Sequence, residues 1–190
     1  LRAPEAEDYP VSSAQQRMWV LMQGQPDSTA YNIPIAFTLK GTPDIGRLQS
    51  ALNTLIGRHE ALRTSFALHG GELRQKICKK AAVELERLEC RRDKLKPFLR
   101  GLIKPFKLDK APLMRAAIIK TDEDAHVLLI DMHHIISDKR TTEILLGELA
   151  RIYSGQALKQ SDIEYRDYAV WQREFLSSDN IALQREFWRT

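Results

Sequence analysis

VLLIDMHHIISD, residues 127–138, is the stretch of this sequence that decides the fold. Its first four residues are apolar and partly β-branched, which predicts a buried strand that ends at His133 and His134. Neighbouring side chains of a strand point to opposite faces, so the two histidines are not expected to share one cleft. One histidine is therefore available for chemistry, and hydrogen bonds are expected to hold the other inside the protein. With Asp138 four residues beyond the second histidine, the pattern indicates acyl-transfer chemistry with a positioned base.

Around this strand, the chain alternates helical and extended patterns, which predicts a mixed α/β fold with a mixed sheet and flanking helices. The expected strands are 33–39, 63–68, 72–77, 83–86, 113–119 and 125–132. Pro34 favours an edge position for the first of them. The expected helices begin after Ser13, Asp44 and Asp138, and a charged helix is expected around 91–102. Tyr165, Tyr168 and Trp171 recur at helical spacing, a stripe that usually packs into a core.

The composition limits the classes of function. With 190 residues and 43% hydrophobic content, the chain is expected to form one domain, 1–190, around one core. Its net charge of +4 comes from cations mixed with acids, which argues against nucleic-acid binding, and no apolar stretch is long enough to cross a membrane. Cys78 and Cys90 are interpreted as free thiols of a reducing compartment, and we expect a cytoplasmic protein.

Four segments together resemble the first four signature motifs of the condensation domains of nonribosomal peptide synthetases. The resemblance spans nearly the whole chain, and all four motifs stand in the family's order. The third segment matches the family's HHxxxDG motif except at its last position, where Lys139 replaces glycine. The segments are SAQQRMW at 13–19, RHEALRTSF at 58–66, HHIISD at 133–138 and YRDYAVW at 165–171.

The resemblance implies a fold of two lobes like chloramphenicol acetyltransferase, with the active site in a tunnel between them. This chain is similar to the amino-terminal lobe, 1–190, without the carboxy-terminal lobe, so the isolated lobe is expected to be inactive. The implied reaction is amide formation between a donor acyl or peptidyl thioester and an acceptor aminoacyl thioester. Upstream and downstream peptidyl carrier proteins bring both on phosphopantetheine arms, so no directly bound cofactor is expected, and an adenylation domain is expected in the same synthetase.

The same resemblance assigns roles to individual residues. His134 is expected to be catalytic, either as a base or hydrogen-bonding partner of the attacking amine or by stabilising a charged tetrahedral intermediate. His133 is expected to be structural. Asp138 is expected to pair with an arginine of the second motif, with Arg63 the first choice and Arg58 the alternative. Residues expected beside the tunnel are Ser137, Lys139 and Arg17, the last of them in a packing role.

Other interpretations remain open beside this one. Epimerization and ester-forming relatives carry the same histidine motif. Lys139 brings a long cationic side chain to a glycine position, which favours a non-catalytic lobe that only binds a carrier protein or the partner lobe, unless the side chain reaches into solvent. Asp138 also fits a simple helix cap. A metal site is not expected, because strand alternation separates the two histidines.

Overall fold

The computed structural model describes residues 2–123, 125–178, 181 and 188. Its larger sheet has the order β2-β7-β6-β5, in which β5 and β6 run parallel and the other neighbours run antiparallel. The four strands are β2 (Asn32–Lys40), β5 (Leu85–Glu89), β6 (Met114–Asp122) and β7 (Ala125–His133). The mixed sheet with flanking helices confirms the predicted fold class, and β2 lies at an edge, as Pro34 predicted.

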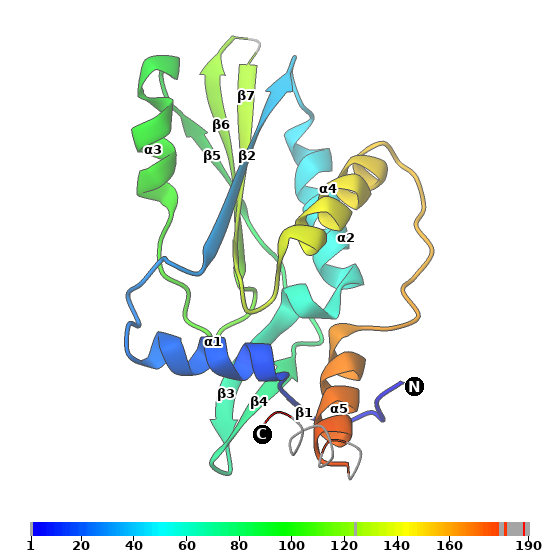
Figure 1. Cartoon of the computed structure of the whole chain (residues 1–190). Helices are drawn as coiled ribbons and strands as arrows, with labels where there is room; N and C mark the ends of the chain where they lie inside the picture. The colour runs from blue at the N-terminus through cyan, green and yellow to red at the C-terminus, as the bar shows by residue number, and fades with distance from the viewer. Residues whose placement is uncertain (1, 124, 179–180, 182–187, 189–190) are drawn as a thin grey trace.

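Helices cover both faces of this sheet (Figure 1). On one face, α2 (Ile45–Arg58) and α4 (Lys139–Tyr153) pack over the main core, to which β7 contributes Leu128, Ile130 and Met132. On the other face, α3 (Leu95–Leu102) packs over Val127 and Leu129. Alternate residues of β7 therefore serve two separate cores, as expected for a central strand buried on both sides.

A second, smaller sheet has the order β1-β4-β3 and is antiparallel throughout. Its strands are β1 (Tyr9–Pro10), β3 (Thr64–His69) and β4 (Glu72–Ile77), and β3 and β4 form the predicted hairpin across Gly70 and Gly71. Two short 3₁₀ helices, η1 (Glu60–Arg63) and η2 (Arg92–Lys94), precede β3 and α3.

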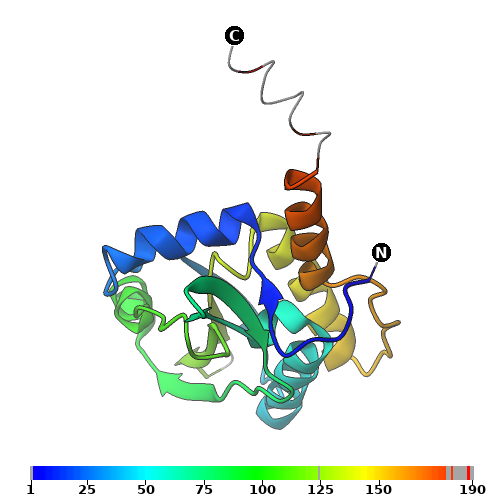
Figure 2. The same ribbon diagram turned by 90° about the horizontal axis from the view of Figure 1, so that it is seen from below.

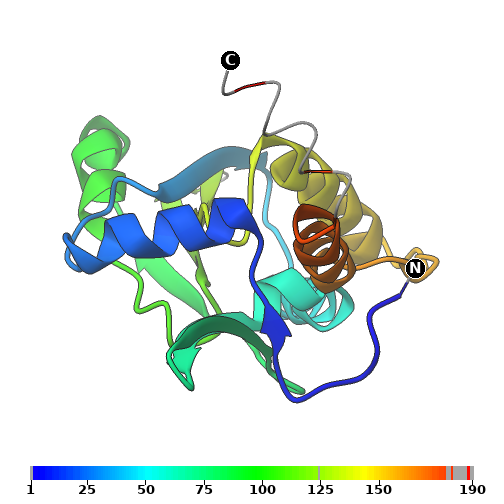
Figure 3. The same ribbon diagram turned by 60° about the horizontal axis from the view of Figure 1, so that its bottom comes forward.

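Helices α1 (Ser13–Gln23) and α5 (Tyr165–Leu176) lie at the same end of the molecule as the small sheet (Figures 1 and 2). Ser12 and Gln15 form a capping box at the start of α1, and the Ser13 amide donates to the Gln172 side chain of α5 at 2.8 Å. The amino-terminal segment runs past α5 into β1 (Figure 3). This end of the fold brings the amino-terminal segment next to α5, where the Ala3 amide donates to Asp167 Oδ1 at 2.8 Å.

Two expectations about local structure are wrong. The aromatic stripe of α5 is not core, since Tyr165, Tyr168 and Trp171 are 39%, 41% and 46% exposed, while the opposite side of the helix buries Asp167 and Ala169. The rings contact one another instead, with centroids 5.5 and 5.8 Å apart.

The strand expected at 83–86 begins later, at Leu85. The Gln49 side chain of α2 donates to the Val83 carbonyl at 2.7 Å and accepts from the Leu85 amide at 2.8 Å. These bonds tie residues 83–85 to the helix, so pairing with β6 starts only at Leu85.

Candidate active site at the end of the central strand

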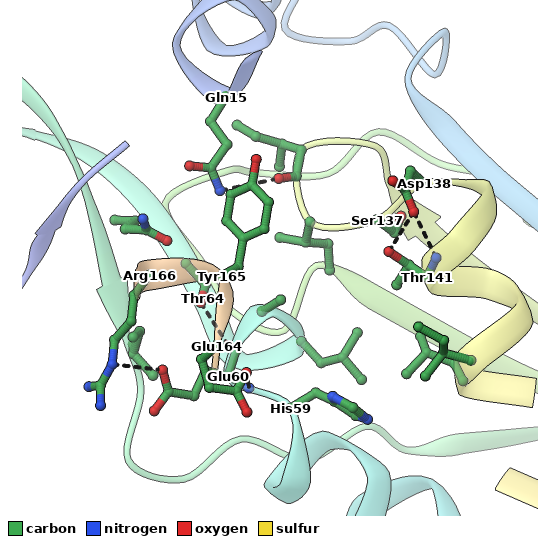
Figure 4. Close-up of a pocket in the computed structure, with 18 of the residues that line it drawn as sticks. Gln15, His59, Glu60, Thr64, Ser137, Asp138, Thr141, Glu164, Tyr165 and Arg166 are labelled. Carbon is green, nitrogen blue, oxygen red and sulfur yellow. Dashed lines mark hydrogen bonds and ion pairs between the residues drawn. The ribbon is translucent and has the colours of Figure 1, made fainter. Parts of the chain in front are cut away.

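A cavity of about 520 Å³ lies where β7 ends, enclosed by α1, η1, β4, α4 and the segment that leads into α5 (Figure 4). Its wall is mainly apolar and includes Met18, Leu62, Ile77, Ile136 and Leu145. Polar groups gather at two places: Ser137, Asp138 and Thr141 on one side, and Glu60, Glu164 and Arg166 on the other. An apolar space with a few convergent polar groups is the usual form of a small-molecule site.

His134 lines this cavity, and two hydrogen bonds fix it. Its amide donates to the Tyr31 carbonyl at 2.7 Å, and its Nδ1 lies 2.7 Å from the Ser137 carbonyl oxygen. A carbonyl oxygen only accepts, so Nδ1 carries the proton and donates it. In the neutral form of this ring, Nε2 is then the acceptor nitrogen, as a general base requires.

His133 is fully buried and points to the other side of the strand. Its Nδ1 accepts from the Ile135 amide at 3.0 Å, and its ring lies between those of Tyr31 and Phe106. Burial, with a smaller effect of His134, lowers the pKa of His133 to about 4, so this ring is neutral near pH 7. The prediction that the two histidines face different surroundings is confirmed, with His133 held by hydrogen bonding.

Asp138 caps α4. Its Oδ1 accepts from the Thr141 amide at 2.7 Å and from the Thr141 hydroxyl at 2.8 Å. These hydrogen bonds, the backbone one first, lower the pKa of Asp138. The simple helix-cap interpretation of this aspartate is thereby confirmed.

The predicted ion pair of Asp138 with an arginine is wrong for both candidates. Arg63 donates to the Cys78 carbonyl at 2.7 Å and lies 3.6 Å from Glu60, within its own 3₁₀ helix. Arg58 pairs through Nε with Glu148 Oε2 at 2.9 Å. Other acids engage both guanidinium groups, and the carboxylate of Asp138 accepts hydrogen bonds from its own helix.

The residues predicted beside the tunnel divide into two groups. Ser137 is buried in the cavity wall, and its hydroxyl donates to the His133 carbonyl at 3.0 Å. Lys139 and Arg17 are exposed, and neither contributes to the wall of this cavity. The Lys139 side chain therefore extends from the first turn of α4 without filling the space beside His134.

The far wall of the cavity is charged, and the sequence did not single out most of its residues. His59 Nε2 donates to Glu148 at 2.6 Å, and burial raises the pKa of Glu164. Although burial alone raises the pKa of Glu148, hydrogen bonds from His59 and Arg58 lower it overall. Acids on α4 and before α5 look like ordinary helix-surface residues in the sequence, because only the fold brings them to η1.

Gln15 also lines the cavity, although the sequence patterns did not mark it as a site residue. It is buried, and its Nε2 lies 3.5 Å from the Ile135 carbonyl, so α1 contacts the loop that carries His134. Its place in the first motif was the available signal.

Within the described ranges, no three His, Cys, Asp or Glu side chains are grouped so that they could hold a metal ion. In the same part of the chain, no helix has the length and apolar character needed to cross a membrane.

Comparison with known proteins places these features in context. The family model described as "Condensation domain" matches residues 5–190. Surfactin synthase subunit 1 of Bacillus subtilis (strain 168) is 43% identical over 186 residues, which is 98% of this chain and 5% of that protein. Tyrocidine synthase 2 of Brevibacillus parabrevis is 41% identical over 191 residues, covering 99% of this chain and 5% of that protein.

Solved structures also include domains with a similar fold. The X-domain from teicoplanin biosynthesis, solved alone and in a complex with OxyB, has a TM-score of 0.88 and 26% identity over 98% of this chain and 44% of its own. The starter condensation domain of rhizomide synthetase RzmA has a TM-score of 0.85 over 96% of this chain and 47% of its own, at 22% identity, so this second likeness concerns the fold. The chain thus spans somewhat less than half of these structures.

Proposed function

Because the chain belongs to the condensation-domain family, we propose that it takes part in amide bond formation by a nonribosomal peptide synthetase. The donor is an acyl or peptidyl thioester and the acceptor an aminoacyl thioester, both held on phosphopantetheine arms of carrier proteins. Synthetases from two genera, each more than 40% identical to this chain, support the proposal.

One observation carries the assignment of His134. Its Nδ1 donates to the Ser137 carbonyl at 2.7 Å, so Nε2 is the basic nitrogen of a side chain that lines the cavity. The attacking amine must lose a proton as it bonds to the thioester carbon, and Nε2 accepts that proton or orients the amine. The thiolate of the donor arm then leaves as the tetrahedral intermediate collapses, and it takes up the proton.

Backbone carbonyl oxygens, of Tyr31 and Ser137, accept both hydrogen bonds of His134. A ring held in this way needs little reorganisation when the amine arrives, which is how positioning contributes to rate. His133 cannot share this role, because its Nδ1 already accepts from the Ile135 amide and its ring is fully buried.

The partners follow from the same proposal. The solved relatives are about twice as long as this chain, which covers 44% and 47% of two of them. We assign the remaining half to a carboxy-terminal lobe that completes the tunnel, without which residues 1–190 are inactive. Upstream and downstream carrier proteins and an adenylation domain complete the set of partners.

The test is single-turnover amide formation by the two-lobed parental domain, with carrier proteins loaded with radiolabelled donor and acceptor. We expect His134→Ala to abolish product, while the matched variant His69→Ala, at an exposed histidine, keeps the wild-type rate. Wild-type product formation by a folded His134→Ala protein would contradict the role of His134. Amide product retained on the downstream carrier argues against the epimerization alternative, and an ester product from a hydroxyl acceptor supports the ester-forming one.

A second candidate function is a lobe that binds proteins without catalysis. Lys139 at the glycine position of the third motif favours it, as does the likeness to an X-domain that was solved in complex with OxyB. This candidate predicts that the parental domain binds loaded carriers but yields amide only after Lys139→Gly. Product from the domain with its natural Lys139 would exclude it.

A further inference from the structure

Asp131, Arg115 and Asn32 form a cluster next to the histidine end of β7, on the face of this strand that faces α3. Asp131 is 2% exposed, and its Oδ2 accepts from Asn32 Nδ2 at 2.7 Å and from Arg115 Nη1 at 3.4 Å. Arg115 and Asp131 stand opposite each other on the paired strands β6 and β7. Burial raises the pKa of Asp131, and the bonds from Asn32 and the charge of Arg115 oppose that rise.

The cluster ties the segment 104–106 to three strands. Arg115 donates from Nη1 to the Lys104 carbonyl and from Nη2 to the Pro105 carbonyl, each at 2.6 Å. Its guanidinium also lies 3.8 Å from the centre of the Phe106 ring. Asn32 donates to the same Lys104 carbonyl at 3.0 Å. The segment 104–106 is thereby fixed against the ends of β2, β6 and β7.

Both histidines contact residues that this cluster holds or that adjoin it. The Phe106 ring meets the edge of the His133 ring, with centroids 6.1 Å apart, and His133 in turn accepts from the Ile135 amide. Tyr31, which directly precedes Asn32, supplies the carbonyl that accepts from the His134 amide at 2.7 Å. A shift of Asn32 or Phe106 therefore moves the backbone on either side of His134.

We propose that Asp131, Arg115 and Asn32 are positioning residues that hold His134 in its productive place. The proposal rests on the catalytic role given to His134 above, and it extends that role to residues that do not line the cavity. None of the three is expected to touch substrate, so each acts through the backbone of Tyr31 or through Phe106 and His133.

A purely stabilising role fits the cluster poorly. Asp131 is buried, and burying a carboxylate is costly even when an arginine pairs with it. Apolar residues of similar volume often replace a buried ion pair without loss of stability. The cluster instead fixes the position of a loop, because one planar guanidinium, that of Arg115, binds the carbonyl oxygens of Lys104 and Pro105.

The experiment measures single-turnover amide formation by the two-lobed parental domain as the concentration of loaded acceptor carrier is varied. The variants of the cluster are Asp131→Asn and Arg115→Met. The matched controls are Asp122→Asn and Arg92→Met, which make the same changes in an exposed ion pair with 3.9 Å between Arg92 Nη1 and Asp122 Oδ2. We expect each cluster variant to lower the maximal rate constant by about 10- to 100-fold, because small displacements of a reacting group are costly. The carrier concentration for half-maximal rate should stay near wild type at a temperature at which every variant is folded, and the control pair should change neither constant.

The double variant Asp131→Asn/Arg115→Met adds a test of coupling. Since both residues act on the same backbone, we expect it to lose no more than the worse single variant. If instead Asp131→Asn destabilises the fold, Arg115→Lys decides, because lysine keeps the charge but cannot hold two carbonyls, and it should still lose rate at an unchanged half-maximal concentration.

The outcomes separate this inference from the function on which it rests. Cluster variants with wild-type rate constants, beside an inactive His134→Ala, would overturn the positioning role alone. A fully active His134→Ala would overturn the role of His134, and the positioning role with it. A rise in the half-maximal concentration at an unchanged maximal rate constant would also overturn the inference, since it would place the cluster in carrier binding.

Discussion

The buried ring of His133 should make the protein less stable as the pH falls, by an amount that follows from its pKa. In the fold this pKa is lowered from 6.5 to about 4, because burial disfavours the charged ring. Between about pH 6.5 and pH 4, the unfolded chain therefore binds a proton at His133 that the folded protein does not bind. This contribution to stability is complete above pH 6.5, is lost as the pH falls, and changes no further below about pH 4. At pH 5 the expected loss is ~2 kcal/mol.

The perturbation that isolates this contribution is His133→Asn. The asparagine carbonyl can replace Nδ1 as the acceptor for the Ile135 amide, and it does not titrate. The free energy of unfolding is measured in urea at pH 7.5 and pH 5, with tryptophan fluorescence from the chain's 3 tryptophans as the signal. Wild type should lose ~2 kcal/mol more than the variant between the two pH values.

Comparing two pH values within each protein removes the cost of the smaller side chain, and groups that titrate alike in both proteins cancel. Equal losses for wild type and His133→Asn would refute the reasoning. They would mean that the ring accepts a proton in the fold as readily as in water.

Three further predictions concern stability and rate. Asp138→Ala removes the side-chain acceptor from the start of α4 and should cost ~1 kcal/mol in thermal unfolding, while a wild-type midpoint would dismiss the cap. Leu52→Ala empties a fully buried site in the main core and should cost about 2 to 5 kcal/mol in urea unfolding, with a loss below that range counting against tight packing there. Lys139→Gly should change the amide-forming rate of the parental domain by less than about threefold, since Lys139 is exposed outside the cavity wall and surface changes have small effects; a large gain would show that the lysine obstructs the site.

Periodicity predicted much of this fold because the patterns that it reads are local. The run before the histidines is a strand, and the hairpin across Gly70 and Gly71 forms where alternation and turn residues indicate it. The stripe of Tyr165, Tyr168 and Trp171 failed because spacing defines a helix face without saying whether a partner covers it.

The site was predictable to the extent that strand alternation governs it. Alternation along a strand is enough to predict that His134 and His133 face different surroundings. The helix cap of Asp138 was predictable, but its lack of an arginine partner was not, because Glu60 and Glu148 engage the two arginines and Glu148 reaches Arg58 only through the packing of α4. The pairing of Asp131 with Arg115 likewise required the register between β6 and β7.

The cavity and the cluster that holds His134 lie on opposite faces of β7. Residues of α1, α4 and the segment before α5 shape the cavity, whereas the cluster around Asp131 lies on the opposite face. Wall side chains that do not touch the loop of His134, such as Met18, Leu62 and Ile77, can therefore be exchanged without disturbing what holds His134. A protein built in this way can acquire new substrates through mutation of one layer while its reactive centre is inherited unchanged, and directed evolution of substrate choice should begin with that layer.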